Sequence, residues 1–474
     1  MKSFYKLGAV AVATLVLAGC ASVNFDQTLA DTTSGSVGTF TGGKLELSRT
    51  EQQAQARNKL AADLLAQPLG MNEAVQLSLA NSPSMQALLA QSWAEMAQAE
   101  QSGRLANPVF TFERMRFVDE LEIGRLLSFG LLDLLTLPRR QAIAQGQVAQ
   151  AKIQLSVSVV EQVTQVRQAW VRAVAAQQTL QYSQQVNAAA QAGAELARRM
   201  QQAGNFNKLQ RAKEQSFYAD AVAQLASAQH ASTAAREELV RQLGLTDAQV
   251  VQLKLPERLP DLPKAPIQTS VFSASAKEQR LDVQLAKHQL DVAGKSQGLN
   301  LLTSLLDVEL GIRRDTVFDN GTGTSAIRKG YELDVRLPIF DWGTSQRAAM
   351  NAQSLAAANR YESTVRGASS QLRESYSAYR TAYDVARHYR DEIVPLRKTM
   401  GEETMLRYNG MLIGVFELLA DTREQISSVS AAINAYQQFW LADAALAASM
   451  IGKPTSAGAM SISSSATAGA EGGH

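Results

Sequence analysis

The run between Pro138 and Gly204 contains no other proline, and its apolar residues recur at intervals of four and three. Val159, Val163 and Val166 follow this heptad spacing, which is typical of a helix that packs along a second helix. A helix of about 66 residues rises about 100 Å, at about 1.5 Å per residue. No compact globular domain needs a helix of that length, so the run predicts an elongated, mainly helical bundle.

A second run, from Gly343 to Gly410, is the counterpart of the first. It carries an apolar and aromatic stripe at the same spacing, formed by Leu372, Tyr376, Tyr379, Tyr383 and Ala386. We interpret this stripe as helix packing rather than a cofactor site, and we expect Pro395 to kink the run near its end. Shorter helical patterns flank the two runs, at residues 71–104, 205–244, 271–301 and 415–452.

The two halves of the chain repeat one another. The segment "GNFNKLQRAKEQ" (204–215) returns as "GVFELLADTREQ" (414–425), at an offset of 210 residues. Earlier in each half, Glu113 in "FTFERM" aligns with Glu309 in "DVELGI", at an offset of 196. The second copy has therefore gained about 14 residues, which fall in "RRDTVFDNGTGTSAIRKG". We expect this Gly/Thr/Asn-rich insertion to form a surface loop over residues 315–329.

Apolar and charged residues alternate strictly in two segments, "LLDVELGIRR" (305–314) and "YELDVRLPIF" (331–340). They alternate less cleanly in "NPVFTFERMRF" (107–117) and "ELEIGRLLSF" (120–129). Such alternation predicts half-buried strands, and it also suits barrel strands whose apolar face meets lipid. Four strands cannot close a barrel, which needs about eight, and an open edge in lipid is unfavourable. If these are membrane strands, several chains must share one barrel.

The first residues resemble an export signal. Lys2 and Lys6 precede the apolar run "LGAVAVATLVLAGC", which is too short to span a membrane as a helix. Cys20 ends this run and is the only cysteine, in a pattern that resembles the lipidation motif of bacterial lipoproteins. We expect residues 1–19 to be a signal peptide and Cys20 to carry lipid, with a buried thiol as the alternative. Ala21 follows, rather than the Asp that retains lipoproteins at the inner membrane, so we expect an outer-membrane destination.

Composition argues against several functions. Without the signal the formal charge falls from +2 to about zero, and nothing indicates nucleic-acid binding. The histidines share no metal-ligand spacing: His230, His288, His388 and His474. No Walker loop, nucleophile elbow or zinc motif occurs, so we expect neither a cofactor nor an enzyme. Four methionines near the ends of the long runs are interpreted as pliable packing, with a soft-metal site as the alternative: Met200, Met400, Met405 and Met411.

The lipidation motif, the duplicated pattern of helices and the two strands per copy together resemble the TolC-like outer-membrane efflux family. The similarity covers about residues 71–452, and its most specific part is "RYNGMLIGVFELLADTREQ" (407–425). The resemblance implies a mainly α fold, with a long α-helical hairpin barrel and a transmembrane β-barrel to which each chain of a homotrimer contributes four strands. It also implies a periplasmic adaptor protein and an inner-membrane pump as partners.

The same resemblance suggests boundaries for the parts of the chain. Residues 1–19 are the expected signal peptide, and 20–70 are a lipidated tether and lead-in, with 21–43 least structured. The first repeat covers 71–250, a linker 251–266, and the second repeat 267–452. The tail, 453–474, is rich in small polar residues, and we expect it to be disordered.

The repeated segment is then expected at the periplasmic tips, where the two helices of each hairpin meet. Glycine would supply the unusual backbone angles that each turn needs. The expected adaptor-contacting tip residues are Gly204, Asn205, Phe206, Gly410 and Gly414. The expected gate residues are Glu417 and Asp421, which share a helix face, with Arg407 and Tyr408 as a latch. A solvated outer face remains the alternative for the two acids.

The predicted function is a passive exit duct for drugs, metal ions or other small solutes that a pump hands over. Two related alternatives remain, a type I secretion duct and a lipid-anchored helical protein of the envelope without a pore. A cell-wall enzyme is disfavoured because no paired-carboxylate cleft is indicated. The transported solute is not determined by these patterns.

Overall fold

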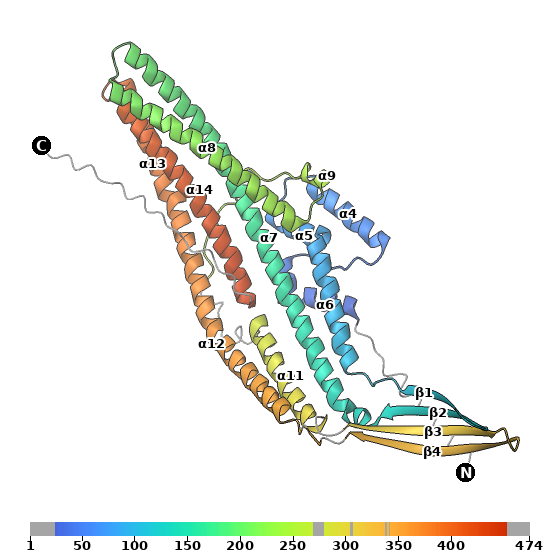
Figure 1. Cartoon of the computed structure of the whole chain (residues 1–474). Helices are drawn as coiled ribbons and strands as arrows, with labels where there is room; N and C mark the ends of the chain where they lie inside the picture. Colours follow the sequence, from blue (N-terminus) through green and yellow to red (C-terminus); the bar gives the residue numbers. More distant parts are fainter. Residues whose placement is uncertain (1–23, 269–278, 304–306, 337–338, 341, 453–474) are drawn as a thin grey trace. The chain divides into compact units, whose positions relative to one another are not determined.

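The computed structural model describes residues 24–268, 279–303, 307–336, 339–340 and 342–452. These residues form a mainly helical protein with one small sheet, which confirms the predicted fold class (Figure 1). The chain divides into two compact units, each taken from both halves of the sequence. The described residues of 1–29, 88–156 and 281–366 form unit 1, and those of 30–87, 157–280 and 367–474 form unit 2.

The sheet of unit 1 is antiparallel and has the strand order β1-β2-β3-β4. Its strands are β1 (Val109–Phe117), β2 (Glu120–Gly130), β3 (Asp307–Asp319) and β4 (Thr324–Arg336). The two hairpins pair through β2 and β3, with Glu120 opposite Asp319 and Gly130 opposite Glu309. The sheet therefore joins the two sequence repeats, and β1 and β4 form its edges.

The expected loop over residues 315–329 is mostly strand. β3 continues to Asp319 and β4 resumes at Thr324, so only four residues form the turn. The Asp319 carboxylate stabilises this turn by accepting hydrogen bonds from the backbone N of Gly321 (2.8 Å) and Thr322 (3.1 Å). The inserted residues thus lengthen the second hairpin, because cross-strand pairing outweighs their turn-like composition.

Unit 1 also contains parts of four helices. The helices that contribute here are α6 (Pro83–Ser102), the start of α7 (Leu131–Gln202), α11 (Leu281–Thr303) and the start of α12 (Thr344–His388). A Cβ on Gly103 would stand 2.7 Å from the Cβ of Ala144, and one on Gly146 would stand 2.8 Å from the Val292 side chain. Glycines at these two places therefore permit close approach to a neighbouring helix.

Unit 2 contains the rest of the long helices. They are the remainder of α7, α8 (Lys208–Leu243), the end of α12, α13 (Val394–Asn409) and α14 (Val415–Ile451). The first long run is one continuous helix, as expected. The second is interrupted by a π-helical turn, η2 (Tyr389–Ile393), directly before α13. Pro395 lies in the first turn of α13, so the break expected at this proline takes the form of a π turn.

Two expectations about the N-terminal hundred residues are corrected. Residues 71–104 form two helices, α5 (Met71–Asn81) and α6, because Pro83 favours an extended conformation at Ser82, which has ψ 122°. Residues 21–43 are more than a tether, since they include α2 (Phe25–Ser34) and α3 (Ser36–Thr41). The side chains of Phe25, Leu29, Val37 and Phe40 are buried. The segment is mainly polar, but the burial of these four apolar side chains stabilises its helices.

The linker between the repeats is ordered and lies against aromatic side chains. It begins directly after α9 (Asp247–Val250), in unit 2, which also contains α4 (Glu51–Leu65). The Tyr383 hydroxyl donates to the carbonyl of Pro263 (3.1 Å), and the Trp440 indole N–H donates to that of Pro260 (3.1 Å). Tyr379 and Tyr383 also pack against Phe439 in the core. The aromatic stripe is helix packing, as expected, and it additionally holds the linker.

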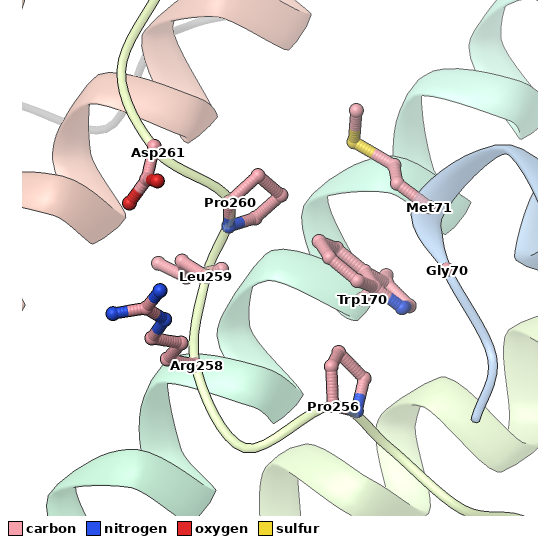
Figure 2. A pocket seen from close by; sticks show the side chains of 8 residues that line it. All are labelled: Gly70, Met71, Trp170, Pro256, Arg258, Leu259, Pro260 and Asp261. Carbon is pink, nitrogen blue, oxygen red and sulfur yellow. The ribbon is translucent and has the colours of Figure 1, made fainter.

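A small pocket lies where the linker crosses α7 (Figure 2). Its volume is about 330 Å³, and Met71, Trp170, Pro256 and Pro260 supply much of its lining. Arg258 and Asp261 point to the opposite side of the linker from Trp170 (Figure 2). The Trp170 indole N–H donates to the carbonyl of Leu69 (2.8 Å). The pocket therefore offers mainly apolar contacts and no cluster of charged groups.

Candidate functional site

The first helical tip, between α7 and α8, ends in a left-handed glycine as expected. Gly204 has φ +80°, its N–H donates to the carbonyl of Gln201 (3.0 Å), and that of Asn205 donates to Met200 (2.8 Å). This is the Schellman arrangement that satisfies the last carbonyls of a helix. Asn207 then caps α8 in a reciprocal capping box with Gln210.

The second tip, between α13 and α14, closes in the same way without a left-handed glycine. Met411 has φ +56°, its N–H donates to the carbonyl of Tyr408 (2.9 Å), and that of Leu412 donates to Arg407 (2.9 Å). Gly410 has φ −79° and Gly414 has φ −80°. The expectation that these two glycines supply the unusual backbone angles is therefore wrong, because Met411 adopts the left-handed conformation.

Residues with equal backbone roles in the two tips are 207 apart, not 210. Gly204 corresponds to Met411 as the left-handed residue, and Asn207 corresponds to Gly414 as the N-cap. The sequence alignment differs by three residues, which is close to one turn of 3.6 residues. A shift of this size keeps apolar residues on the same helix face, so the sequence pattern alone cannot detect it.

The two tips contact each other within unit 2. The rings of Phe206 and Phe416 have centroids 4.8 Å apart. Ala197, Phe206 and Val415 form a buried cluster, against which Met200 and Leu419 also pack. Figure 1 shows the α7–α8 turn and the α13–α14 turn at the same end of this unit. The apolar residues of the repeated segment therefore hold one tip against the other.

A buried ion pair joins the two hairpins further along the helices. Arg423 of α14 contacts the carboxylate of Glu214 of α8 at 2.5 Å, and Glu214 is only 2% exposed. The Arg423 guanidinium also lies over the Phe217 ring, 4.7 Å from its centroid. In the alignment of the repeats at the 210-residue offset, Lys213 and not Glu214 takes the place of Arg423. Only the packing of α8 against α14 identifies the partner.

The two predicted gate acids have different surroundings. Asp421 lines a groove of about 530 Å³ together with residues of α13, among them Gly401 and Met405. A Cβ on Gly401 would stand 3.6 Å from an Asp421 carboxylate oxygen, so the two helices approach closely here. Glu417 is exposed and does not line this groove. The shared helix face of the two acids is retained, since they are four residues apart on α14.

The predicted latch residues act through their backbone in this structure. Arg407 and Tyr408 provide the carbonyl groups that close the second tip, and both side chains are exposed. Among the ion pairs of the described residues, none links Arg407 to Glu417 or Asp421. Of the four methionines, Met200 packs in the tip cluster, whereas Met400, Met405 and Met411 are exposed.

The sheet of unit 1 exposes its apolar residues. Directly opposed residues share a face, and successive residues alternate. We call "apolar face" the side that carries Phe110, Phe112, Leu127, Ile312, Tyr331 and Leu333, which are 42–85% exposed. The other side, the polar face, includes Gly124, Asp315 and Val317, which are buried. A sheet with its large apolar side chains exposed is suited to a lipid or protein environment.

The polar face is organised around Arg313. Its guanidinium contacts the carboxylates of Asp315 (2.9 Å), Glu113 (3.1 Å) and Glu332 (3.7 Å), which come from three different strands. A Cβ on Gly124 would stand 3.3 Å from an Asp315 oxygen, so a glycine leaves room for this network. Charged residues of the alternating segments therefore lie on one face of the sheet and pair with one another there, as strict alternation predicts.

A partly buried carboxyl group was not predicted from the sequence. Burial of Asp443 on α14 raises its pKa from 3.8 to about 6, although the nearby Arg167 opposes this shift. Burial in turn lowers the pKa of Arg167. The Arg167 guanidinium donates to the carbonyl of Phe40 (2.6 Å) and lies 4.3 Å from the centroid of its ring. The Ala-rich sequence of α14 around Asp443 did not indicate a buried carboxyl group.

Comparison with solved structures shows which proteins have a similar fold. No protein-family model and no curated protein matches the chain by sequence. The Campylobacter jejuni CmeC outer membrane channel is similar at a TM-score of 0.68 and 13% identity, over 86% of this chain and 89% of that one. The outer-membrane channel OprN matches at 0.66 and 17%, over 89% and 95%. The chain has the fold of these TolC-like outer-membrane channels.

A third solved outer-membrane channel has a similar fold. The open state of the Neisseria gonorrhoeae MtrE outer membrane channel matches at a TM-score of 0.63 and 18% identity, over 84% of this chain and 89% of that one. These neighbours are channel proteins rather than enzymes. Within the described residues, no helix is long and apolar enough to cross a membrane, and no cluster of His, Cys, Asp and Glu could hold a metal ion. Cys20 lies outside the described residues.

Proposed function

We propose that the chain forms the outer-membrane exit duct of a tripartite efflux system. The observation that carries the proposal is the sheet of unit 1, whose large apolar side chains are exposed while Arg313 pairs with three carboxylates on the other face. Such a sheet is unfavourable in water, and β1 and β4 are left as open edges. Lipid would cover the apolar face, and pairing with the strands of further copies would close the edges at β1 and β4.

A homotrimer is the proposed assembly. Three copies of this sheet would give twelve strands, which is enough to close a barrel, whereas one copy is not. The long helices of unit 2 would then supply a helical tunnel through the periplasm. Lipid on Cys20 would add an anchor in the outer membrane, after removal of residues 1–19. The likeness in fold to outer-membrane channels supports this arrangement.

The helical tips are the proposed contact with an adaptor protein and an inner-membrane pump. Gly204 and Asn205 are exposed in the first tip, as are Gly410 and Gly414 in the second, whereas Phe206 is buried and holds the tips together. Six tips would surround one opening in a trimer. Glu417 and Asp421 are the proposed lining of the constriction there, with Arg407 and Tyr408 in the adjoining turn.

Conductance in a planar lipid bilayer tests the proposal. We expect the purified full chain to open a narrow channel, and Phe206→Ala to raise its conductance, because the variant removes the ring that stacks on Phe416. The matched control is Leu209→Ala, which removes an exposed apolar side chain near the start of α8 that lies outside the tip cluster. A protein that inserts but never conducts, with or without the tip substitution, would favour the lipid-anchored helical protein without a pore.

The gate assignment has a separate test. Rings of carboxylates in a narrow aqueous channel favour cations, so Glu417→Gln with Asp421→Asn should weaken cation selectivity. The measurement is the reversal potential of single channels under a salt gradient. Glu402→Gln with Glu403→Gln is the control, since it removes two charges from α13 instead. An unchanged reversal potential in the Glu417 and Asp421 variant would place these acids outside the constriction.

A further inference from the structure

Cations gather on the apolar face of the sheet. The strand register places Arg125 opposite Arg314, and Arg314 opposite Lys329, so one row across three strands is entirely basic. Arg114 lies on the same face of β1, diagonal to Arg125 in the next row. We call these four residues the cation cluster. Adjacent strands are about 4.8 Å apart, so these charges are close neighbours.

The cation cluster has no carboxylate on its own face. Every acidic residue whose side chain is described on the four strands lies on the polar face: Glu113, Glu120, Glu122, Glu309, Asp315, Asp319, Glu332 and Asp334. Arg125 donates a hydrogen bond to the Thr316 hydroxyl (3.3 Å), which is neutral. Like charges directly opposite one another destabilise a sheet. A bound anion would therefore relieve a repulsion that the described carboxylates of this sheet do not offset.

The position of the cluster identifies the kind of anion. The rows on one side of it carry Leu310 with Leu333, and then Ile312 with Tyr331, and these rows are apolar across the sheet. The basic row comes two residues further along each strand, which is about 7 Å. The apolar face therefore changes from apolar to cationic over one row, and the two rows beyond it, toward the hairpin turns, mix Arg114 and Arg116 with Ile123, Thr316 and Ile327 and with Leu121, Phe318 and Ser325. Lipid presents the complementary order, with acyl chains followed by charged headgroups.

We propose that Arg114, Arg125, Arg314 and Lys329 bind the phosphate groups of membrane lipid headgroups on the part of the apolar face that lies toward the hairpin turns. This inference rests on the proposed function, because it requires the apolar face to meet lipid. Guanidinium groups bind phosphate through paired, charge-assisted hydrogen bonds, and long basic side chains reach from apolar surroundings to the headgroup level. Bound phosphate also removes the repulsion within the row.

Native mass spectrometry of the full chain in detergent tests this inference. The probes are lipid A with two phosphates, monophosphoryl lipid A, and phosphatidylcholine. We expect the affinity to fall in that order, with at least a tenfold difference between the first and the last, since each basic side chain near an anionic headgroup contributes about fivefold. The variant Arg114→Gln/Arg314→Gln/Lys329→Gln keeps only Arg125 of the cluster, and it should bind all three lipids within about fivefold of one another.

A matched pair of single substitutions separates the two faces of β4. Lys329→Gln should weaken lipid A binding about fivefold, whereas Arg328→Gln, which removes the neighbouring exposed charge from the polar face, should leave it unchanged. Equal effects of the two, or a triple variant that keeps its preference for lipid A, would overturn the inference. Full competition by inorganic phosphate would assign the cluster to a free anion and overturn the lipid assignment.

Bilayer conductance of the same preparation distinguishes the two proposals. A wild-type protein that conducts but binds phosphorylated and zwitterionic lipids equally refutes only the cation cluster as a lipid site. A protein that neither conducts nor binds lipid refutes the exit duct and, with it, the lipid site. The triple variant should still conduct, because its substitutions lie on the apolar face and leave the Arg313 network intact.

Discussion

At the scale of single residues, the left-handed Met411 is the least expected feature of the tips. A residue with a Cβ is about 1 kcal/mol or more less stable than glycine in this conformation, and Met411 is 92% exposed, so its side chain gains little by packing. We infer that the second tip tolerates this strain because its Schellman hydrogen bonds depend on the backbone alone.

Met411→Gly should therefore stabilise the second tip by about 0.5–1 kcal/mol. Thermal unfolding of the purified protein measures this as a rise in Tm. Gly204→Ala is the reciprocal variant at the first tip and should lower Tm, because it places a Cβ at φ +80°. A fall in Tm for Met411→Gly would show that the Met411 side chain contributes a contact in the assembled protein.

Asp443 should give the stability a dependence on pH. Because its pKa is raised from 3.8 to about 6, the folded protein binds this proton more tightly than the unfolded chain does. The group therefore destabilises the fold progressively as the pH rises from about 4 to 6, and fully above that. Asp443→Asn should raise stability at pH 8 by up to about 3 kcal/mol, and by less at pH 5.

The measurement for Asp443 is Tm at both pH values, with Asp384→Asn as the control. Asp384 is an exposed acid that pairs with Arg380 on α12. The interpretation fails if Asp443→Asn changes Tm equally at pH 5 and pH 8, because a structural effect of the amide would not depend on pH.

At the scale of secondary structure elements, the pair of Glu214 and Arg423 connects α8 with α14. Removing one member of a buried pair leaves an uncompensated charge, whereas replacing both with apolar residues often changes stability little. Arg423→Met alone should therefore destabilise unit 2 by about 3 kcal/mol, and Glu214→Leu with Arg423→Met should restore much of this loss. Thermal unfolding of the three proteins gives the comparison.

The exposed pair of Glu195 and Arg198 on α7 is the matched control for this comparison. Arg198→Met should change Tm little, because solvent screens an exposed pair. If the single Arg423→Met variant unfolds at the wild-type temperature, the pair does not hold the hairpins together, and the Phe206 and Phe416 cluster must do so alone.

At the scale of the whole molecule, the second hairpin should reach the cell exterior in the proposed duct. Its turn lies at the end of β3 and β4, away from the strand ends that connect to α11 and α12. A peptide tag inserted after Gly321 should therefore bind antibody on intact cells. A tag after Gly204 should bind only after the outer membrane is permeabilised, and the opposite result would reverse the topology.

Much of this architecture follows from local periodicity. The heptad spacing in α7 and the alternation in β3 and β4 predicted helices and strands, because each pattern depends only on neighbours along one element. The repeat of "GNFNKLQRAKEQ" as "GVFELLADTREQ" and its resemblance to TolC-like channels predicted where the helical turns lie. The groove beside Asp421 was not predicted, since it depends on how closely α13 approaches α14 at Gly401.

The sequence by itself determined the two long helical runs, the four strands and their order, and which residues of each strand share a face. Tertiary structure decided how those elements align. In the tertiary structure Arg423 pairs with Glu214, and Met411 adopts the left-handed conformation. Most of residues 315–329 are strand, and Arg125, Arg314 and Lys329 lie in one row of the sheet. The physical reason is that periodicity is a local property, whereas strand register and helix contact are decided by residues far apart in the chain.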